Sequence, residues 1–178
     1  MNKIQSVLFT VAFTVLGVTY SQVQNLEVTS LFNDKVTLKI PKGFTVMSQE
    51  MLKVKYPSDR RPSIVFTNPS GTINIAINKT SNPASPNQIA AIEENYVQTF
   101  KSFYPSAKWI DNGVLTVDDK QIGFIELITP AVDTEIYNLM FFTDLNGQLL
   151  LGTFNCTEPN MENWSSTAKV IMNSLKIK

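Results

Sequence analysis

The chain contains no histidine and only one cysteine, Cys156, among its 178 residues. Because histidine is the commonest general base and zinc ligand, its absence removes the usual routes to acid–base and zinc chemistry. A single thiol cannot form an intramolecular disulfide. The seven glycines are scattered singly, so there is no glycine-rich phosphate loop. The fragment Asp111-Asn112-Gly113 is too short for a calcium loop. The sequence therefore predicts neither a cofactor nor a metal site.

An excess of charge of either sign is also missing. Lysine and arginine total 15, and aspartate and glutamate total 15. Removal of residues 1–21 would take away Lys3 and leave 14 minus 15, a net charge of −1. The chain therefore has no global field that would attract nucleic acid or an anionic membrane. Hydrophobic residues make up 43% and charged residues 17%, which is typical of a globular domain.

The first 21 residues have the pattern of a secretory signal peptide. Lys3 supplies the positive charge, residues 7–18 are mostly apolar, and Thr19 and Ser21 are the small residues before a cut at Gln22. The apolar run has about 12 residues, whereas a membrane-spanning helix needs about 20. We expect cleavage near Ser21, no stable membrane span afterwards, and a periplasmic or secreted location. A retained N-terminal anchor is the alternative.

Residues 22–178 contain no repeat and no linker, and they suit one domain. Alternating or continuous apolar runs between turn residues predict several strands, and short turns between consecutive runs indicate antiparallel pairing. Asn68-Pro69-Ser70-Gly71 predicts one hairpin, and Asn146-Gly147 predicts another. The meander strands are apolar on both faces, so we expect them to be central and covered on both sides. The predicted strands are residues 36–40, 64–67, 72–78, 109–117, 121–129, 137–143 and 148–156.

Two helices are predicted from apolar residues that recur every three or four positions. The first begins after Ser85-Pro86 with a capping pattern completed by Gln88, and Pro105 ends it. The second follows Pro159. Phe100 and Trp164 are the bulky members of these stripes, so we expect both in the core. The predicted stripes are Ile89, Ile92, Tyr96, Phe100 and Phe103, and Met161, Trp164, Ala168, Ile171, Met172 and Leu175.

These elements predict an α+β fold, a mainly antiparallel sheet flanked by a long central helix and a C-terminal helix. The layout, with the opening from Val36 to Phe44 (VTLKIPKGF) and the closing Trp164 helix that ends in Ser174-Leu175-Lys176-Ile177, resembles the Mog1/PsbP-like α/β sandwich family. The resemblance covers about residues 26–177 in layout only. It implies a binding or accessory protein, as members include a Ran-binding nuclear protein, a photosystem accessory subunit and secretion-effector chaperones. It places no functional residue in this chain.

The candidates for catalysis are weak. Cys156 has no histidine and no positively charged neighbour to form a thiolate, so we interpret it as a structural cysteine at a strand end. Glu93 and Glu94 lie off the apolar stripe of their helix and are expected on a solvated face. Asp118 and Asp119 suit a turn. A hydrolase that uses two convergent carboxylates stays open as an alternative, although no pair can be placed together.

One local excess of charge remains, the segment from Lys53 to Arg61, called here the basic segment. Four positive side chains surround Tyr56 and face a single Asp59, so this segment is the candidate binding site for an unknown protein or an anionic ligand. The alternative is a solvated loop with an internal ion pair. The candidate binding residues are Lys53, Lys55, Tyr56, Arg60 and Arg61.

The sequence therefore predicts an exported, non-enzymatic binding or accessory protein of the cell envelope. Two other functions stay open, the carboxylate-dependent hydrolase and a chaperone for exported hydrophobic segments. A deep hollow with two facing acids would favour the hydrolase. An exposed apolar groove would favour the chaperone.

Overall fold

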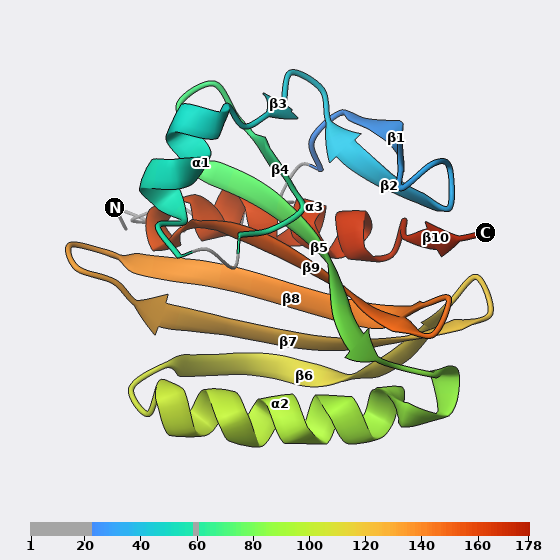
Figure 1. Cartoon of the computed structure of the whole chain (residues 1–178). Coiled ribbons are helices and arrows are strands. Elements are labelled where there is room, and N and C mark those ends of the chain that lie inside the picture. Colours follow the sequence, from blue (N-terminus) through green and yellow to red (C-terminus); the bar gives the residue numbers. More distant parts are fainter. Residues whose placement is uncertain (1–22, 59–60) are drawn as a thin grey trace, which may run out of the picture.

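The computed structural model describes residues 23–58 and 61–178 (Figure 1). The predicted signal peptide lies outside the described residues. The strands and the two helices predicted from the sequence are all present, in the predicted order along the chain. The elements are β1 (Leu26–Leu31), β2 (Val36–Pro41), β3 (Thr45–Val46), α1 (Gln49–Lys55), β4 (Ile64–Thr67), β5 (Ile73–Pro83), the 3-10 turn η1 (Pro86–Gln88), α2 (Ile89–Phe103), β6 (Lys108–Val117), β7 (Lys120–Pro130), β8 (Glu135–Leu145), β9 (Gln148–Thr157), the 3-10 turn η2 (Glu158–Asn160), α3 (Met161–Met172) and β10 (Lys176–Ile177).

Within the described residues the strands form two antiparallel sheets. The larger sheet has seven strands in the order β3-β4-β5-β9-β8-β7-β6, and the smaller has three in the order β1-β2-β10. The predicted meander is the run β6 to β9. Its last turn has Asn146 at φ 52° and Gly147 at φ 80°, the left-handed geometry that an Asn-Gly hairpin turn requires.

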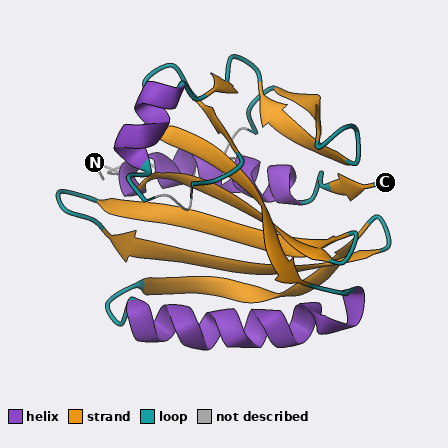
Figure 2. Cartoon of the chain, viewed as in Figure 1, coloured by secondary structure: helices purple, strands orange, loops and turns teal. Residues whose placement is uncertain are grey.

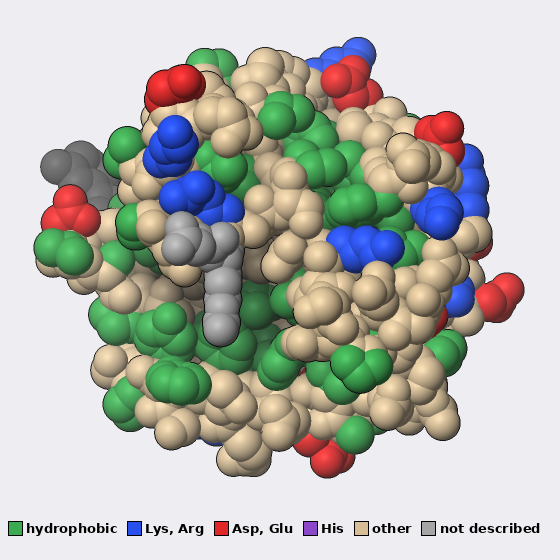
Figure 3. Space-filling model, in the orientation of Figure 1, with side chains coloured by type: hydrophobic (Ala, Val, Ile, Leu, Met, Phe, Trp, Pro, Cys, Tyr) green, Lys and Arg blue, Asp and Glu red, His purple; other side chains and the backbone are tan. Residues whose placement is uncertain are grey.

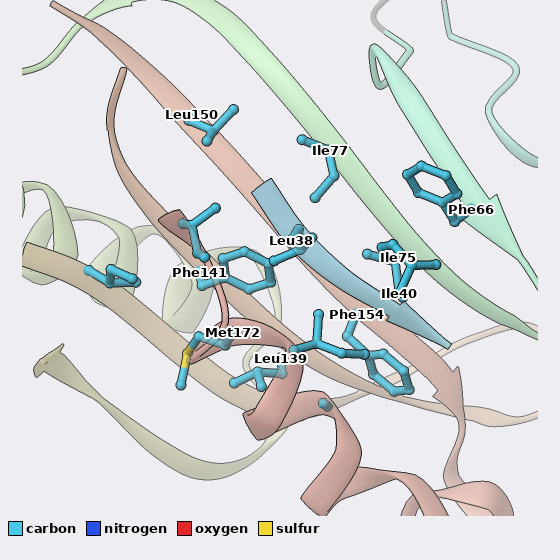
Figure 4. Packing of buried hydrophobic residues seen from close by; sticks show 14 of the residues in the cluster. Leu38, Ile40, Phe66, Ile75, Ile77, Leu139, Phe141, Leu150, Phe154 and Met172 are labelled. Atoms are coloured by element: carbon cyan, nitrogen blue, oxygen red, sulfur yellow. The ribbon is translucent and has the colours of Figure 1, made fainter. Parts of the chain in front are cut away.

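One face of the larger sheet, called here the inner face, holds the main hydrophobic core. Alternate residues of the central strands point to this face, and α3 and the smaller sheet cover it (Figures 2 and 4). Leu38 and Ile40 of β2 pack into the same cluster as Phe154 of β9. Burial of this apolar surface is the largest favourable contribution to the fold. The fully buried side chains of this cluster include Leu38, Ile75, Leu139, Phe141 and Phe154.

The opposite face, called here the outer face, is covered only at its two ends. At one end, side chains of α1 and Tyr56 pack on Met47, Val65 and Ala76. At the other end, α2 packs on β6, β7 and β8. In Figure 1, α1 lies at the top of the view and α2 at the bottom. Between them, Asn138 and Met140 of β8 stay half-exposed. The prediction that the meander strands are covered on both sides is therefore wrong for this strip, because two separate helices cannot cover the whole face.

The orientation of α2 differs from the predicted one. Its buried residues are Ile89, Glu93 and Val97, whereas Phe103 is 75% exposed. The predicted solvated position of Glu93 is therefore wrong, since its side chain is turned toward β6. Ser85 begins the turn η1, but its hydroxyl bonds the side chains of Asn87 and Gln88 instead of a backbone amide.

The two aromatic residues expected in the core are only half-buried. Trp164 lies against Phe44 and Phe154, with ring centroids 5.7 and 6.0 Å away. Phe100 stacks on Tyr104 at 5.9 Å. Both rings lie at the margin of their clusters. The buried helix residues nearest to them, Ala168 in α3 and Val97 in α2, lie one turn away, and strand residues fill the rest of each cluster.

Candidate functional site

The basic segment lies at the end of α1, and the structure brings together only part of it. Lys53 and Lys55 are exposed, whereas Tyr56 and Arg61 are half-buried. Arg60 and Asp59 lie outside the described residues. Lys55 Nζ donates to the carbonyl oxygen of Gly71, and Arg61 Nε donates to the carbonyl oxygen of Tyr56 at 2.8 Å. Lys55 therefore holds the end of α1 against the β4–β5 turn, whereas Arg61 bonds the backbone of the segment itself.

A hollow of about 410 Å³ opens beside this end of α1, and it is called here the α1 hollow. In Figure 3, Lys or Arg side chains gather over α1, and the surface between the regions of α1 and α2 is hollowed. Among the described residues that line the α1 hollow, none carries a carboxylate, and Lys55 carries the one formal charge. The lining residues are Lys55, Tyr56, Ser70, Gly71, Thr72, Asn74, Ile136, Asn155, Cys156 and Thr157.

Three asparagines stand in one row across the outer face, and they are called here the asparagine row. Asn74 of β5 pairs with Asn155 of β9, and Asn155 pairs with Asn138 of β8. Because side chains alternate along a strand, residues in one register row share a face. Asparagine is depleted in strands, so three in neighbouring central strands are unusual.

Side-chain hydrogen bonds join two members of the asparagine row, Asn74 and Asn155, to each other and to their neighbours. Thr67 Oγ1 donates to Asn74 Oδ1 at 2.8 Å, and Asn74 Nδ2 donates to Asn155 Oδ1 at 3.1 Å. Asn155 also forms a side-chain hydrogen bond with Tyr56. Bonds that run in one direction strengthen one another and orient the amides. Asn74 and Asn155 therefore present fixed donors and acceptors to the α1 hollow, and Asn138 lies beside Asn155 on the open part of the outer face.

Burial sets the ionisation of the phenol in the α1 hollow. The pKa of Tyr56 is raised, chiefly because burial disfavours the phenolate, while the hydrogen bond with Asn155 acts in the opposite direction. Tyr56 is therefore a neutral hydroxyl at neutral pH, able to donate and accept hydrogen bonds.

Cys156 is buried, and burial raises the pKa of its thiol to about 12. A thiol with this pKa is protonated at neutral pH, so it is a poor nucleophile. The structural interpretation of Cys156 is consistent with this environment, at the end of β9 on the inner face.

The buried carboxylates do not converge on the α1 hollow. Glu126 is 1% exposed on the inner face, where Tyr137 donates to its Oε1 at 2.8 Å and Lys169 Nζ lies 3.0 Å from its Oε2. Glu93 accepts from Asn112 Nδ2 at 2.7 Å beside α2, in the lining of a separate hollow of about 510 Å³. Each acid has its own local partner. In the described part of the chain, no three His, Cys, Asp or Glu side chains are grouped so as to hold a metal ion.

Two members of the asparagine row, Asn138 and Asn155, were not predicted as site residues from the sequence. A signal was present, because each amide interrupts an otherwise apolar central strand. Asn74 lies on the face opposite Ile73 and Ile75, as alternation of side chains along β5 requires. The register that aligns the three strands could not be predicted from the sequence. Within residues 23–58 and 61–178, no helix is long and apolar enough to cross a membrane.

Solved structures of the same architecture support the fold. The solution structure of cyanobacterial PsbP (CyanoP) from Synechocystis superposes with a TM-score of 0.63 at 14% identity, covering 92% of this chain and 99% of that chain. The Ran-binding protein Mog1p of Saccharomyces cerevisiae gives 0.58 at 8% identity, covering 86% and 96%. LpqN of Mycobacterium tuberculosis, a protein involved in cell envelope biogenesis, gives 0.57 at 11% identity, covering 87% and 92%.

No known family model and no curated protein sequence matches the chain. At these low identities the structural matches establish architecture and carry no functional residue across. The predicted architecture is confirmed: the chain has the Mog1/PsbP-like α/β sandwich fold.

Proposed function

We propose that this chain is an exported, non-enzymatic binding or accessory protein of the cell envelope, and that it binds an anionic ligand or partner at the α1 hollow. One observation carries the proposal. The described lining of this hollow combines Lys55 with amide and hydroxyl side chains and includes no carboxylate. Such a lining repels no anion and offers several hydrogen bonds, which suits binding rather than proton transfer.

A non-catalytic role is supported by the chemistry of the side chains. The chain has no histidine, its one thiol is protonated at neutral pH, and Glu126 and Glu93 lie in different parts of the molecule. A glycosidase would need two carboxylates across one cleft. A chaperone for hydrophobic segments would need an exposed apolar groove, whereas the lining of the α1 hollow includes Lys55 and several hydroxyl and amide side chains.

Export rests on residues 1–21, with cleavage before Gln22. The likeness to LpqN, a cell-envelope protein, supports the same compartment. Intact-mass measurement on protein recovered from the native host tests this part. A mass that corresponds to residues 22–178 is expected, and a mass that includes residues 1–21 would contradict it.

The binding role is tested with a fourfold variant of the basic segment, in which Lys53, Lys55, Arg60 and Arg61 are changed to serine. We expect the variant to lose the partner that the parent captures from envelope extract. Binding by the parent should weaken as salt rises, because screening weakens attraction between exposed charges. The variant loses the hydrogen bonds of Lys55 and Arg61, each worth about 1 kcal/mol, so its fold must be checked by urea unfolding.

A matched control removes the same charge elsewhere. Four exposed lysines, Lys35, Lys39, Lys42 and Lys79, are changed to serine, which lowers the net charge equally. The control should keep the partner. If the control also loses the partner, binding depends only on the net charge of the protein. If the basic-segment variant keeps every partner, the segment is a solvated loop.

A further inference from the structure

We propose that the asparagine row and Tyr56 recognise sugar hydroxyls, so that the ligand of the α1 hollow is an acidic oligosaccharide, a chain of sugar rings that carry carboxylates. This inference rests on the proposed function and names the chemistry of its ligand. The first support is the kind of group that the hollow offers. An amide side chain has both donors and acceptors, and so does a sugar hydroxyl. A ligand with only acceptors would bind the N–H groups of these amides and leave their oxygen atoms without a partner.

The hydrogen bonds of the asparagine row leave capacity for such a ligand. Asn74 accepts from Thr67 Oγ1 and donates to Asn155 Oδ1. Asn138 uses its amino group twice, toward Thr129 Oγ1 at 3.1 Å and the carbonyl oxygen of Ile136 at 3.0 Å. As far as the described residues go, its carboxamide oxygen is left as an acceptor. The amides are therefore held in place by the protein, and the half-buried Asn138 and Asn155 can still bind a ligand, which lowers the entropy cost of binding.

Apolar side chains beside the row suit the other surface of a sugar, its C–H groups. Ile136 lines the α1 hollow next to the amides, and Met140 and Leu151 are half-exposed on the same face. The volume of about 410 Å³ lies within the range of roughly 300–1,000 Å³ that small-molecule sites occupy.

The charges favour an acidic sugar over a neutral one. Lys55 lines the α1 hollow, and Lys53 and Arg61 belong to the same segment, so carboxylates of the ligand would meet cations at this end. A negatively charged peptide fits less well. The floor is the face of a sheet whose central strands already pair on both sides, so a peptide finds no free strand edge to extend.

The test measures binding of three probes to the chain of residues 22–178 by titration calorimetry. The probes are an oligomer of hexuronic acids, the same oligomer with its carboxyl groups reduced to alcohols, and a glutamate peptide of equal charge. The hexuronic acid oligomer should bind at micromolar to millimolar concentration. The reduced oligomer should bind at least tenfold more weakly, and the peptide should bind weakest.

Substitutions then distinguish the contribution of the amide side chains to binding from the contribution of the charges. Asn138→Ala and Asn155→Ala should each weaken binding of the oligosaccharide by about tenfold, because each removes fixed hydrogen-bonding groups. Asn78→Ala is the matched control: Asn78 lies on the same face of β5, four residues from Asn74, and accepts from Ser63 Oγ at 3.0 Å. This control should bind as the parent does. Unchanged thermal unfolding shows that a loss of binding is not a loss of fold.

Two results would overturn the inference. If the glutamate peptide binds as tightly as the oligosaccharide and the Asn138 and Asn155 variants bind it normally, charge alone selects the ligand. The carbohydrate inference then fails, while the proposed binding function survives. If the parent binds no hexuronic acid oligomer at millimolar concentration, the inference is wrong. Loss of the cellular partner in the fourfold variant is a separate readout, so failure of the proposed function is recognised independently.

Discussion

The two faces of the seven-stranded sheet are made by alternate residues of the same strands, yet they differ in composition and in cover. On β8, Leu139 and Phe141 point to the inner face and are at most 1% exposed, whereas Asn138 and Met140 point to the outer face and are half-exposed. The inner face is sealed by α3 and the smaller sheet. The outer face has a helix at each end and an open strip between them.

The difference shows which residues stabilise the fold and which do not. Inner-face residues are apolar and closely packed, as burial requires. The asparagine row uses a residue type that strands disfavour, at positions where valine or threonine would fit the same backbone. The presence of such residues on the outer face supports the binding role proposed for it.

The largest effect is expected from an inner-face truncation. Phe141→Ala should lower the free energy of unfolding by about 3–5 kcal/mol, because it removes a fully buried ring and leaves a cavity. Urea unfolding measures the loss. Met140→Ala is the matched control on the opposite face of the same strand, and it should cost less than half as much. Equal losses would mean that the two faces contribute equally to the free energy of unfolding.

A smaller effect tests how closely the inner face is packed. The Cβ of an alanine at Gly152 would lie 2.2 Å from the ring of Phe141, so Gly152→Ala forces this ring to move. We expect a loss of about 1–3 kcal/mol, typical of overpacking. When Gly152→Ala is made in the Phe141→Leu variant, the loss of unfolding free energy should be smaller, because the ring is absent. A double-mutant cycle measures the coupling, and additivity would contradict the predicted contact.

Alkaline pH should destabilise the chain through the inner face. Burial raises the pKa of the Cys156 thiol from 9.0 to about 12, and burial is also the largest cause that raises the pKa of Tyr137. The folded state therefore keeps these protons at a pH where the unfolded state has lost them. The stabilisation is complete below pH 9 and is lost as pH rises toward 12, by up to about 1.4 kcal/mol per pH unit for each group.

Urea midpoints measured at steps from pH 7 to pH 11 test this pH dependence. Cys156→Ala should make the decline between pH 9 and pH 10 shallower, because the thiol no longer contributes. A decline of the same slope in this variant would show that the thiol contributes nothing.

The smallest effect on stability is expected on the outer strip. Asn138→Thr should lower the free energy of unfolding by no more than about 1 kcal/mol, because the better strand propensity of threonine offsets part of the loss of two hydrogen bonds. Chemical unfolding of parent and variant provides the measurement. A loss above about 2 kcal/mol would give Asn138 a structural role and weaken the contrast between the faces.

Most of the fold could be predicted from local patterns. Alternating apolar residues, the Asn146-Gly147 turn and the stripes of the two helices depend on neighbours in the sequence, so the strands and their antiparallel order could be inferred. The orientation of α2 was harder. Ile92, Tyr96 and Phe103 suggested a stripe, but the structure buries Glu93, because Asn112 of the neighbouring strand supplies its hydrogen bond.

The candidate site was only partly predictable, because part of it depends on contacts between residues that are distant in the sequence. The basic segment is contiguous in the sequence, so its charge could be recognised. The asparagine row joins Asn74 to residues 64 and 81 positions further along the chain, and no local pattern indicates that they will be neighbours.

By itself, the sequence determined the class of the fold and the narrow range of available chemistry, since composition and short-range periodicity depend on residue types and their spacing alone. The tertiary structure decided which face each helix covers and which side chains share a register row. These depend on strand pairing across large separations, and the open strip on the outer face exists only because α1 and α2 pack at opposite ends of one sheet.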